Sequence, residues 1–356
     1  MGVLVLYIRE VDLKNFRNFT DYTIYLDKGT NIILGKNAVG KTNILESIYL
    51  LSRGRSFKTS RLSEIIKYDE DNFFIGIKAV RSSGEFTAQF GYAQDNKKQI
   101  KINGIEINKQ SELLGNIYTI LFLPEDLYIV KGNPQIRRNF IDEALLQIRP
   151  NYTYDLMRYY KVLKQRNNLL KNIAKKPSLR YTLDSWDEQI AAYGIKVATI
   201  RARFVETLSR AVADIHKNLS GGEELEIKYL VNFGNNIDMY RELLKSSVEK
   251  DITYGQTTIG PHRDDIKILL DGKAARTFAS QGQQRTIALS LKLAEIKIIR
   301  DNIGESPVFL LDDVFSELDD DRKMCVMKNI KDIQSVITAN DIHMDGSWNV
   351  IRLGVI

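Results

Sequence analysis

The sequence predicts an α/β protein whose α/β domain is divided along the chain by an inserted, mainly helical domain. A glycine-rich loop, GKNAVGKT at 35–42, lies between an apolar strand and an apolar helix. Near the other end, the apolar run VFLL at 308–311 precedes two aspartates. From about 125 to 250 strand patterns almost vanish and helical periodicity replaces them. We therefore assign 1–124 and 252–356 to the α/β domain and 125–251 to the inserted domain.

The first quarter of the chain predicts strands on both sides of one helix. Apolar residues alternate through VLVLYIREVDL and YTIYL, and the apolar NIIL leads into the glycine loop. A helix is expected from about 40 to 51. The segments FFIGIKAV, EFTAQFGYA and KQIKING alternate again and are separated by turn residues. They predict antiparallel strands that flank the main sheet.

The rest of the chain predicts long helices and then a return of the α/β pattern. KKPS at 175–178 should separate two helices, because proline interrupts a helix interior. SGGEE at 220–224 is typical of a helix end and a turn. From about 253 we expect the strand DIKILL, a turn at DGK, a helix over 281–300, the strand VFLL, another helix and the strand SVIT.

Composition excludes several classes of protein. Of the 356 residues, 44% are hydrophobic and 27% are charged, which is ordinary for a folded globular chain. A single cysteine, Cys325, excludes an internal disulfide framework and a cysteine-based zinc site. The N-terminus lacks the basic region of a signal peptide, and no run of about 18 apolar residues occurs. We expect a cytoplasmic protein with no membrane partner, and its net charge of +6 permits a nucleic-acid partner.

The loop at 35–42 fits the phosphate-binding pattern G-x-x-x-x-G-K-[ST]. Glycines let the backbone fold so that its N–H groups face a phosphate at the positive end of a helix. The lysine would neutralise the β- and γ-phosphates, and the threonine hydroxyl would face Mg²⁺. The sequence therefore predicts an ATP site at Gly35, Lys36, Asn37, Ala38, Val39, Gly40, Lys41 and Thr42.

Asp312 and Asp313 supply the acidic half of the predicted site. In a parallel sheet, ligands bind at the carboxyl ends of the strands, where these two residues lie. Asp312 would hold Mg²⁺ together with Thr42, and Asp313 would polarise the attacking water. A solvated acidic strand end is the alternative for this pair taken alone.

The stretch FASQGQQR at 278–285 leads into a long predicted helix. Ser280 is a good N-cap, so a plain helix cap is one interpretation. Gly282 keeps the mouth of the helix free of side chains. The amides there and the Ser280 hydroxyl are therefore also suited to a phosphate.

Several blocks of the chain resemble a known family. ASQGQ at 279–283 is similar to the signature motif of ABC-type ATPases of the SMC-related kind. Together with it, the following blocks resemble the RecF family of bacterial recombination-repair proteins: KNFRNF, GKNAVGKTN, GRSFKT, LPEDL, RRNFID, LKQRNNLLK, TIGPHRDD, SQGQQR and LLDDVFSELD. They occur in order over nearly the whole chain. The resemblance implies an ABC-type P-loop ATPase head with flanking antiparallel strands and an inserted helical domain.

The resemblance also implies a function. RecF-like proteins bind ATP and Mg²⁺, form a homodimer when ATP is bound, and bind single- and double-stranded DNA. They act with RecO and RecR at gapped DNA to help load RecA, and have roles in replication and the SOS response. In such heads the signature motif reaches the γ-phosphate held by the opposite subunit. Carried over, Ser280, Gly282 and Gln283 would contact ATP in trans, and slow hydrolysis would act as a dimerisation switch.

The chain departs from the family pattern at three positions. Asp313 stands where many ABC ATPases carry glutamate, and its shorter arm fits slow turnover. Gln281 occupies the first of two positions that are usually glycine. His343 lies too far after the strand SVIT for us to assign it as a γ-phosphate sensor.

Two basic segments are candidates for DNA contact. Arg53, Arg55, Lys58 and Arg61 follow the first helix, and a solvated basic loop is the alternative interpretation. The inserted domain interleaves basic and aromatic residues, a pattern that suits nucleic acid as well as ordinary helix packing. They are Arg137, Arg138, Arg149, Arg158, Lys161, Lys164 and Arg166, with Tyr152, Tyr154, Tyr159 and Tyr160. His262 is either structural or a link to the nucleotide site.

Two other functions share the phosphate loop. An ATPase subunit of an ABC membrane transporter has the same motifs, but the basic helical insert disfavours it. A monomeric P-loop kinase would have no use for a signature motif. Phosphoryl transfer to a metabolite would identify the kinase, and co-purification with a membrane protein would identify the transporter subunit.

Overall fold

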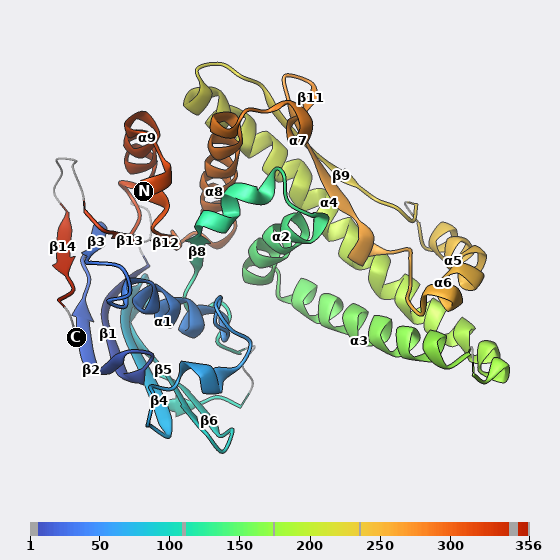
Figure 1. The fold of residues 1–356 in the computed structure, drawn as a ribbon, viewed down its shortest axis with the longest axis horizontal. Helices are drawn as coiled ribbons and strands as arrows, with labels where there is room; N and C mark the ends of the chain where they lie inside the picture. Colours follow the sequence, from blue (N-terminus) through green and yellow to red (C-terminus); the bar gives the residue numbers. More distant parts are fainter. Residues whose placement is uncertain (1–5, 109–111, 174, 235, 342–347, 355–356) are drawn as a thin grey trace. The chain divides into compact units, whose positions relative to one another are not determined.

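The fold is described by a computed structural model for residues 6–108, 112–173, 175–234, 236–341 and 348–354 (Figure 1). Contacts divide the chain into two compact units. We call residues 1–128 and 285–356 the discontinuous unit, and residues 129–284 the inserted unit.

The core of the discontinuous unit is a parallel sheet of five strands in the order β14-β3-β13-β12-β8. Its strands are β3 (Thr30–Leu34), β8 (Thr119–Phe122), β12 (Val308–Asp312), β13 (Ser335–Ala339) and β14 (Asn349–Arg352). β12 and β13 are buried along their whole length, as expected for central strands covered on both faces. The sheet joins strands from both ends of the chain, which makes the unit discontinuous.

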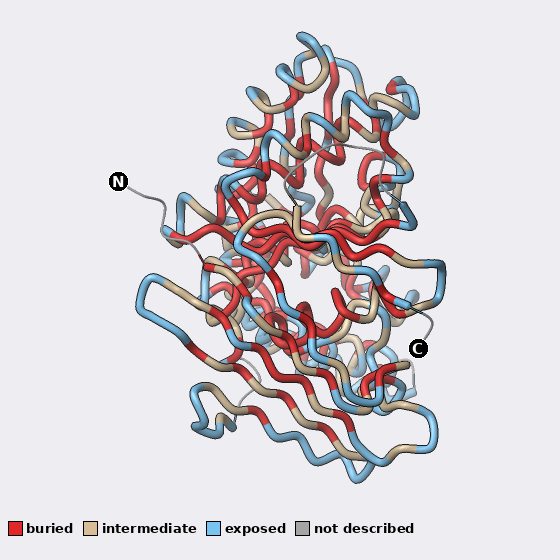
Figure 2. Tube along the Cα trace, turned by 90° about the vertical axis from the view of Figure 1, so that its left-hand side faces the viewer, coloured by how far each residue is buried: buried red, intermediate tan, exposed pale blue. Residues whose placement is uncertain are grey.

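A second, antiparallel sheet follows the order β2-β1-β4-β5-β6-β7. Its strands are β1 (Tyr7–Phe16), β2 (Phe19–Tyr25), β4 (Asn72–Arg81), β5 (Gly84–Ala93), β6 (Lys98–Ile102) and β7 (Ile105–Glu106). Buried and more open residues alternate along β5, so that one face packs and the other meets solvent (Figure 2). These are the flanking antiparallel strands that the sequence predicts.

Helix α1 (Lys41–Arg53) contacts strands of both sheets, including β13 and β4. Most of it is buried for that reason. Its other helices among the described residues are α9 (Asp320–Ile330), the short η1 (Leu62–Ile65) and η6 (Val314–Glu317), and most of η3 (Pro124–Ile129) and of α8 (Gln281–Ile303). No helix in the described part of the chain is long and apolar enough to cross a bilayer.

The inserted unit consists mainly of helices with one small sheet. Its helices are α2 (Pro134–Ile148), α3 (Pro150–Ile173), η4 (Pro177–Thr182), α4 (Leu183–Ser220), α5 (Ile237–Ser246), α6 (Val248–Tyr254), η5 (Pro261–Arg263) and α7 (Ala275–Phe278). The predicted helix break at 175–178 is confirmed, because α3 ends at Ile173 and α4 begins at Leu183. The predicted helix end at 220–224 is confirmed as well, with Gly221 in the left-handed conformation after Ser220.

The inserted unit extends beyond the segment 125–251 that we expected from the sequence. The strands β9 (Leu225–Leu230), β10 (Asp265–Leu270) and β11 (Lys273–Ala274) form an antiparallel sheet within it. β10 pairs with β9 over its whole length, so the segment after 251 stays with the inserted unit as far as 284.

Buried ion pairs hold the helices of the inserted unit together. Arg166 is fully buried and donates to Asp187 and Asp251, each at 2.6 Å. Arg201 is also fully buried and donates to both carboxylate oxygens of Asp142, at 2.9 and 2.8 Å. Removing one partner of such a pair costs about 3–5 kcal/mol, because a buried charge loses its compensation.

This burial corrects part of the basic–aromatic surface that we expected on the inserted domain. Five of its residues are buried and do not face solvent: Arg137, Arg138, Arg166, Tyr152 and Tyr159. Arg137 donates to Asp265 instead, at 2.7 Å. An amphipathic pattern alone does not separate such internal arginines from surface ones, because their partner carboxylates lie far away in the sequence. Arg149, Arg158, Lys161, Lys164, Tyr154 and Tyr160 remain exposed.

His262 is a structural residue of the inserted unit. Its Nε2 lies 2.9 Å from the carbonyl oxygen of Thr257 and therefore donates to it, so Nδ1 accepts from the Tyr159 hydroxyl at 2.6 Å. This is the neutral tautomer, and burial lowers the pKa of His262 to about 4. The close packing continues at Gly260, where a Cβ would lie 2.2 Å from the Tyr240 hydroxyl and where φ is +134°.

Acid should destabilise the inserted unit through His262. The imidazole pKa is lower in the folded state than the unfolded value of about 6.5, so its contribution to stability is full above that pH. It is lost as the pH falls from about 6.5 to about 4, by about 3 kcal/mol in total. We expect urea unfolding of the wild-type protein to show this loss, and His262→Gln, which does not titrate, to show less of it. Parallel pH profiles for the two proteins would contradict the assignment.

Candidate nucleotide-binding site

The loop at 35–42 connects β3 to α1, as the sequence predicts. Gly40 precedes the helix with φ of +106°, and a Cβ there would lie 2.7 Å from the Asn18 side chain. That side chain also donates to the carbonyl of Val39 at 3.0 Å. Only glycine fits a position with this backbone angle and this close a neighbour. Its presence lets the loop fold tightly at the N-terminus of α1, where anions are favoured.

The Lys41 ammonium lies across the mouth of the loop. Its Nζ donates to the carbonyls of Gly35 and Lys36, at 2.7 and 3.2 Å, and to Asn340 Oδ1 at 2.8 Å. All three acceptors are uncharged. Among the described residues no carboxylate lies within ion-pair distance of this ammonium. Its charge is therefore available to a phosphate placed in the loop.

Three side chains meet at the carboxyl ends of β12 and β13. Asp312 Oδ1 accepts hydrogen bonds from the hydroxyls of Thr42 and Thr338, each at 2.8 Å. Burial raises the pKa of Asp312, and these two hydrogen bonds oppose the shift. A hydroxyl and a carboxylate that converge beside a phosphate loop are the hard oxygen donors that Mg²⁺ takes. The donor set thus fits the predicted Mg²⁺ site at Thr42 and Asp312.

Asp313 stands one residue beyond the end of β12 and is turned into the site by an unusual backbone. Its φ is +50°, a left-handed conformation that aspartate tolerates better than most residues. The Asp313 amide donates to Thr338 Oγ1 at 2.9 Å, which holds this turn. The residue lines the same cavity as the phosphate loop.

That cavity, which we call the nucleotide cavity, has a volume of about 350 Å³. It is lined by Asn37, Ala38 and residues 40–43, with Lys58 and Asp313. The structure therefore brings the predicted loop and the predicted acidic residue together. Gly35, Lys36 and Val39 belong to the loop but do not line the cavity.

Lys58 and Asn43 are the cavity residues that the sequence did not place there. Lys58, which we also expected to contact DNA, lines the nucleotide cavity, and its Nζ donates to Asn43 Oδ1 at 2.8 Å. Partial desolvation lowers the pKa of Lys58, and the nearby Glu46 and Asp312 carboxylates oppose the shift. Asn43 directly follows the loop motif in the sequence, so its place in the cavity could have been predicted from that position. No spacing rule brings Lys58 to the loop, because the turn after α1 decides where it lies.

The other basic residues after α1 differ from one another. Arg53 is buried, and its Nη2 donates to the carbonyl of Thr119 at 3.3 Å. It is therefore not a surface contact for DNA, contrary to our expectation. Arg55 and Arg61 are exposed. Arg61 lies 3.7 Å from Glu64.

The predicted signature residues form a reciprocal cap at the start of α8. The Gln283 amide donates to Ser280 Oγ at 3.2 Å, and the Ser280 amide donates to Gln283 Oε1 at 2.8 Å. This is a capping box. The Gln283 side chain also donates to Glu223 Oε1 at 2.7 Å. The helix cap predicted for Ser280 is thus confirmed as local structure. His343 lies outside the described residues.

Known proteins resemble this chain over nearly its whole length. The RecF/RecN/SMC N terminal domain matches residues 7–346. A DNA replication and repair protein RecF from Ruminiclostridium cellulolyticum is 42% identical over 344 residues, covering 94% of this chain and 92% of the relative. The RecF of Acetivibrio thermocellus is 43% identical over 345 residues, covering 94% of each chain.

Solved structures agree with these relatives. One, of the recombination mediator protein RecF-ATPrS in the RecFOR pathway, has a TM-score of 0.92 and 38% identity, and covers 99% of each chain. An Smc head bound to the C-winged helix domain of ScpA has a TM-score of 0.55 at 19% identity, with 93% of this chain and 89% of that chain covered, which shows a shared fold. The predicted head-domain fold and the resemblance are therefore confirmed. The chain belongs to the RecF family of DNA replication and repair proteins.

Proposed function

We propose that this protein is an ATP-dependent switch in recombinational DNA repair. It binds ATP with Mg²⁺, dimerises when ATP is bound, and binds single- and double-stranded DNA as the closed dimer. In the cytoplasm it acts at DNA gaps with RecO- and RecR-type partners to help load RecA, in replication and in the SOS response.

The observation that carries this proposal is the meeting of Thr42 with Asp312. Their side chains come from elements 270 residues apart in the chain, and the hydroxyl donates to the carboxylate at 2.8 Å. The phosphate loop and Lys41 lie beside them in the nucleotide cavity. Thr42 and Asp312 would hold Mg²⁺, which would supply positive charge beside the phosphates. Asp313 lies in the same cavity, where it would orient and polarise the attacking water.

Dimerisation follows from having one phosphate loop and one signature cap per chain. If the cap at Ser280, Gly282 and Gln283 completes the site of another copy, the natural assembly is a twofold dimer with two identical ATP sites. ATP then stabilises the dimer by mass action, and hydrolysis releases it. The capping box holds Ser280 and Gln283 at the start of α8, and the N-terminus of a helix favours an anion.

Several observations favour repair over a transporter ATPase. The relatives reported above are DNA replication and repair proteins, and they match this chain across both units. The recombination mediator RecF is also described with ATP and in the RecFOR pathway. The large inserted unit keeps exposed basic residues on α3, including Arg158, Lys161 and Lys164.

Sedimentation velocity tests the switch. We expect monomers without nucleotide, dimers with ATP and Mg²⁺, and dimers that carry a gapped DNA duplex when all three are present. Lys41→Ala, which removes the ammonium from the loop, should remain monomeric with ATP. Monomers at saturating ATP, or equal dimerisation in its absence, would contradict the proposal.

A further inference from the structure

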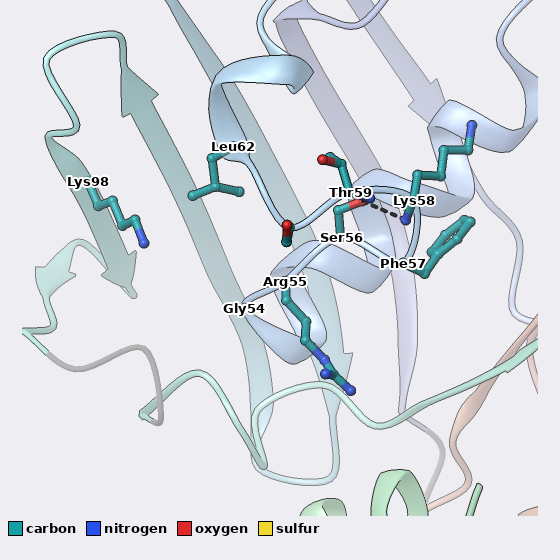
Figure 3. Close-up of a pocket in the computed structure, with 9 residues that line it drawn as sticks. Gly54, Arg55, Ser56, Phe57, Lys58, Thr59, Leu62 and Lys98 are labelled. Atoms are coloured by element: carbon teal, nitrogen blue, oxygen red, sulfur yellow. Dashed lines mark hydrogen bonds between the residues drawn. The ribbon is translucent and has the colours of Figure 1, made fainter. Parts of the chain in front are cut away.

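A second cavity lies in the discontinuous unit (Figure 3) and shares Lys58 with the nucleotide cavity. We call it the loop cavity, and its volume is about 480 Å³. Residues 54–60, which follow α1, form one side together with Leu62, and Lys98 of β6 approaches from the antiparallel sheet. Residues more than 30 positions apart thus face one hollow.

The segment that forms this cavity is held in a fixed shape. Ser56 Oγ accepts from the amides of Lys58 and Thr59, at 2.9 and 3.1 Å (Figure 3). The same hydroxyl donates to the carboxylate of Glu46, which is fully buried on α1. Arg17 in turn donates to both oxygens of Glu46, at 2.9 and 2.6 Å. The cavity is therefore a preformed feature of the fold.

The loop cavity is positively charged. Arg55, Lys58 and Lys98 line it, and no acidic residue does. Two carboxylates that contact this segment are already engaged, since Glu46 is paired with Arg17 and Glu64 lies 3.7 Å from Arg61. Among the described residues, no carboxylate lies within ion-pair distance of Lys98 or Lys58. Such a site attracts an anion.

We propose that the loop cavity binds a backbone phosphate of nucleic acid, and this inference rests on the DNA binding proposed above. The ammonium groups of Lys58 and Lys98 and the hydroxyl of Ser60 are donors suited to phosphate oxygens. Nothing in the lining is arranged to receive a base. Phe57 packs edge-on against Tyr49, with ring centroids 5.5 Å apart and planes at 85°. The contact therefore positions the strand and carries no sequence information.

Lys98 is the residue with which to test this site. Lys58 lines both cavities, so its replacement would disturb nucleotide and DNA together. Of these two cavities, Lys98 lines the loop cavity alone. Its neighbour Lys97 is equally basic and exposed, but it is paired with Asp95 at 2.6 Å and does not line the cavity, so it makes a matched control.

The experiment measures binding of a labelled gapped duplex, with ATP and Mg²⁺, from about 50 to about 200 mM salt in steps of roughly 50 mM. For Lys98→Ala we expect weaker binding, with a slope of log K against log salt reduced by about 1. Lys98→Glu should weaken binding further, because a carboxylate repels the phosphate. Lys97→Ala should match the wild-type protein. ATP-driven dimerisation, followed by sedimentation, should be the same in all four proteins.

Three results would overturn the inference. The first is that Lys98→Ala keeps the wild-type affinity and salt slope. The second is that Lys97→Ala and Lys98→Ala lose the same amount, which would indicate only a diffuse surface charge. The third result combines two measurements: pyrophosphate raises the thermal stability of the wild-type protein but not of Lys98→Ala, while the two proteins bind DNA equally well. It would indicate that the cavity binds a free anion and not a DNA phosphate. Failure of all four proteins to dimerise with ATP would instead contradict the proposed function.

Discussion

Replacing Asp313 by asparagine should slow ATP hydrolysis by about 10²–10⁴-fold, the usual contribution of a general base. The carboxylate at this position lines the nucleotide cavity together with the phosphate loop. Asparagine cannot accept a proton from the attacking water. ATP binding and ATP-driven dimerisation should persist, because the loop, Lys41 and Asp312 are unchanged. The variant should therefore accumulate as a dimer that dissociates slowly, measurable by phosphate release and by sedimentation.

We expect the Asp313→Asn substitution to leave the local backbone unchanged. Asp313 has φ of +50°, and asparagine tolerates that conformation as well as aspartate does. Its contact with Thr338 is made by the backbone amide, which the substitution keeps. Asp320→Asn, a change of the same kind on the exposed first turn of α9, serves as the control. An Asp313→Asn protein with the wild-type rate would remove Asp313 from the reaction.

The local structure of the site could be predicted from the sequence because its motifs are contiguous. The loop 35–42 carries its own glycines, and the strand and helix around it show their periods directly. The pairing of Asp312 with Thr42 was also accessible, since the carboxyl ends of parallel strands share one edge of a sheet. In both cases the deciding physics is local or follows from a general rule of sheet topology.

What could not be predicted depends on contacts between distant segments. Arg53 resembles a surface arginine in the sequence, but it is buried at the end of α1 against β8. Arg166 is likewise internal because Asp187 and Asp251 come from other helices. The boundary of the inserted unit lies beyond 251 because β10 pairs with β9. The hydrophobic pattern of a strand does not determine its pairing partner. Each of these errors concerns a partner that lies far away along the chain.

Mixing two inactive variants should restore activity if the signature cap acts in trans. Ser280→Arg places a large side chain at the exposed mouth of α8 and leaves its own phosphate loop intact. Lys41→Ala disables the loop and leaves its own cap intact. Each protein alone should neither hydrolyse ATP nor dimerise with it. A mixed dimer contains one complete site, formed by the loop of the Ser280→Arg chain and the cap of the Lys41→Ala chain.

The mixture therefore distinguishes a signature cap that acts on the ATP site of its own chain from one that acts on the ATP site of the partner. Single variants do not separate these two arrangements. If Ser280 contacts ATP bound to its own chain, each subunit of the mixed dimer has a defective ATP site, and the mixture does not hydrolyse ATP. If it serves the partner, hydrolysis appears on mixing and rises with the concentration of the second variant. Ser280→Asn is the matched control, because asparagine still caps the helix through its side chain and should dimerise alone. Loss of the helix cap lowers the free energy of unfolding by only about 1 kcal/mol. A folded Ser280→Arg protein without ATPase activity therefore indicates a defect in the ATP site and not a loss of stability.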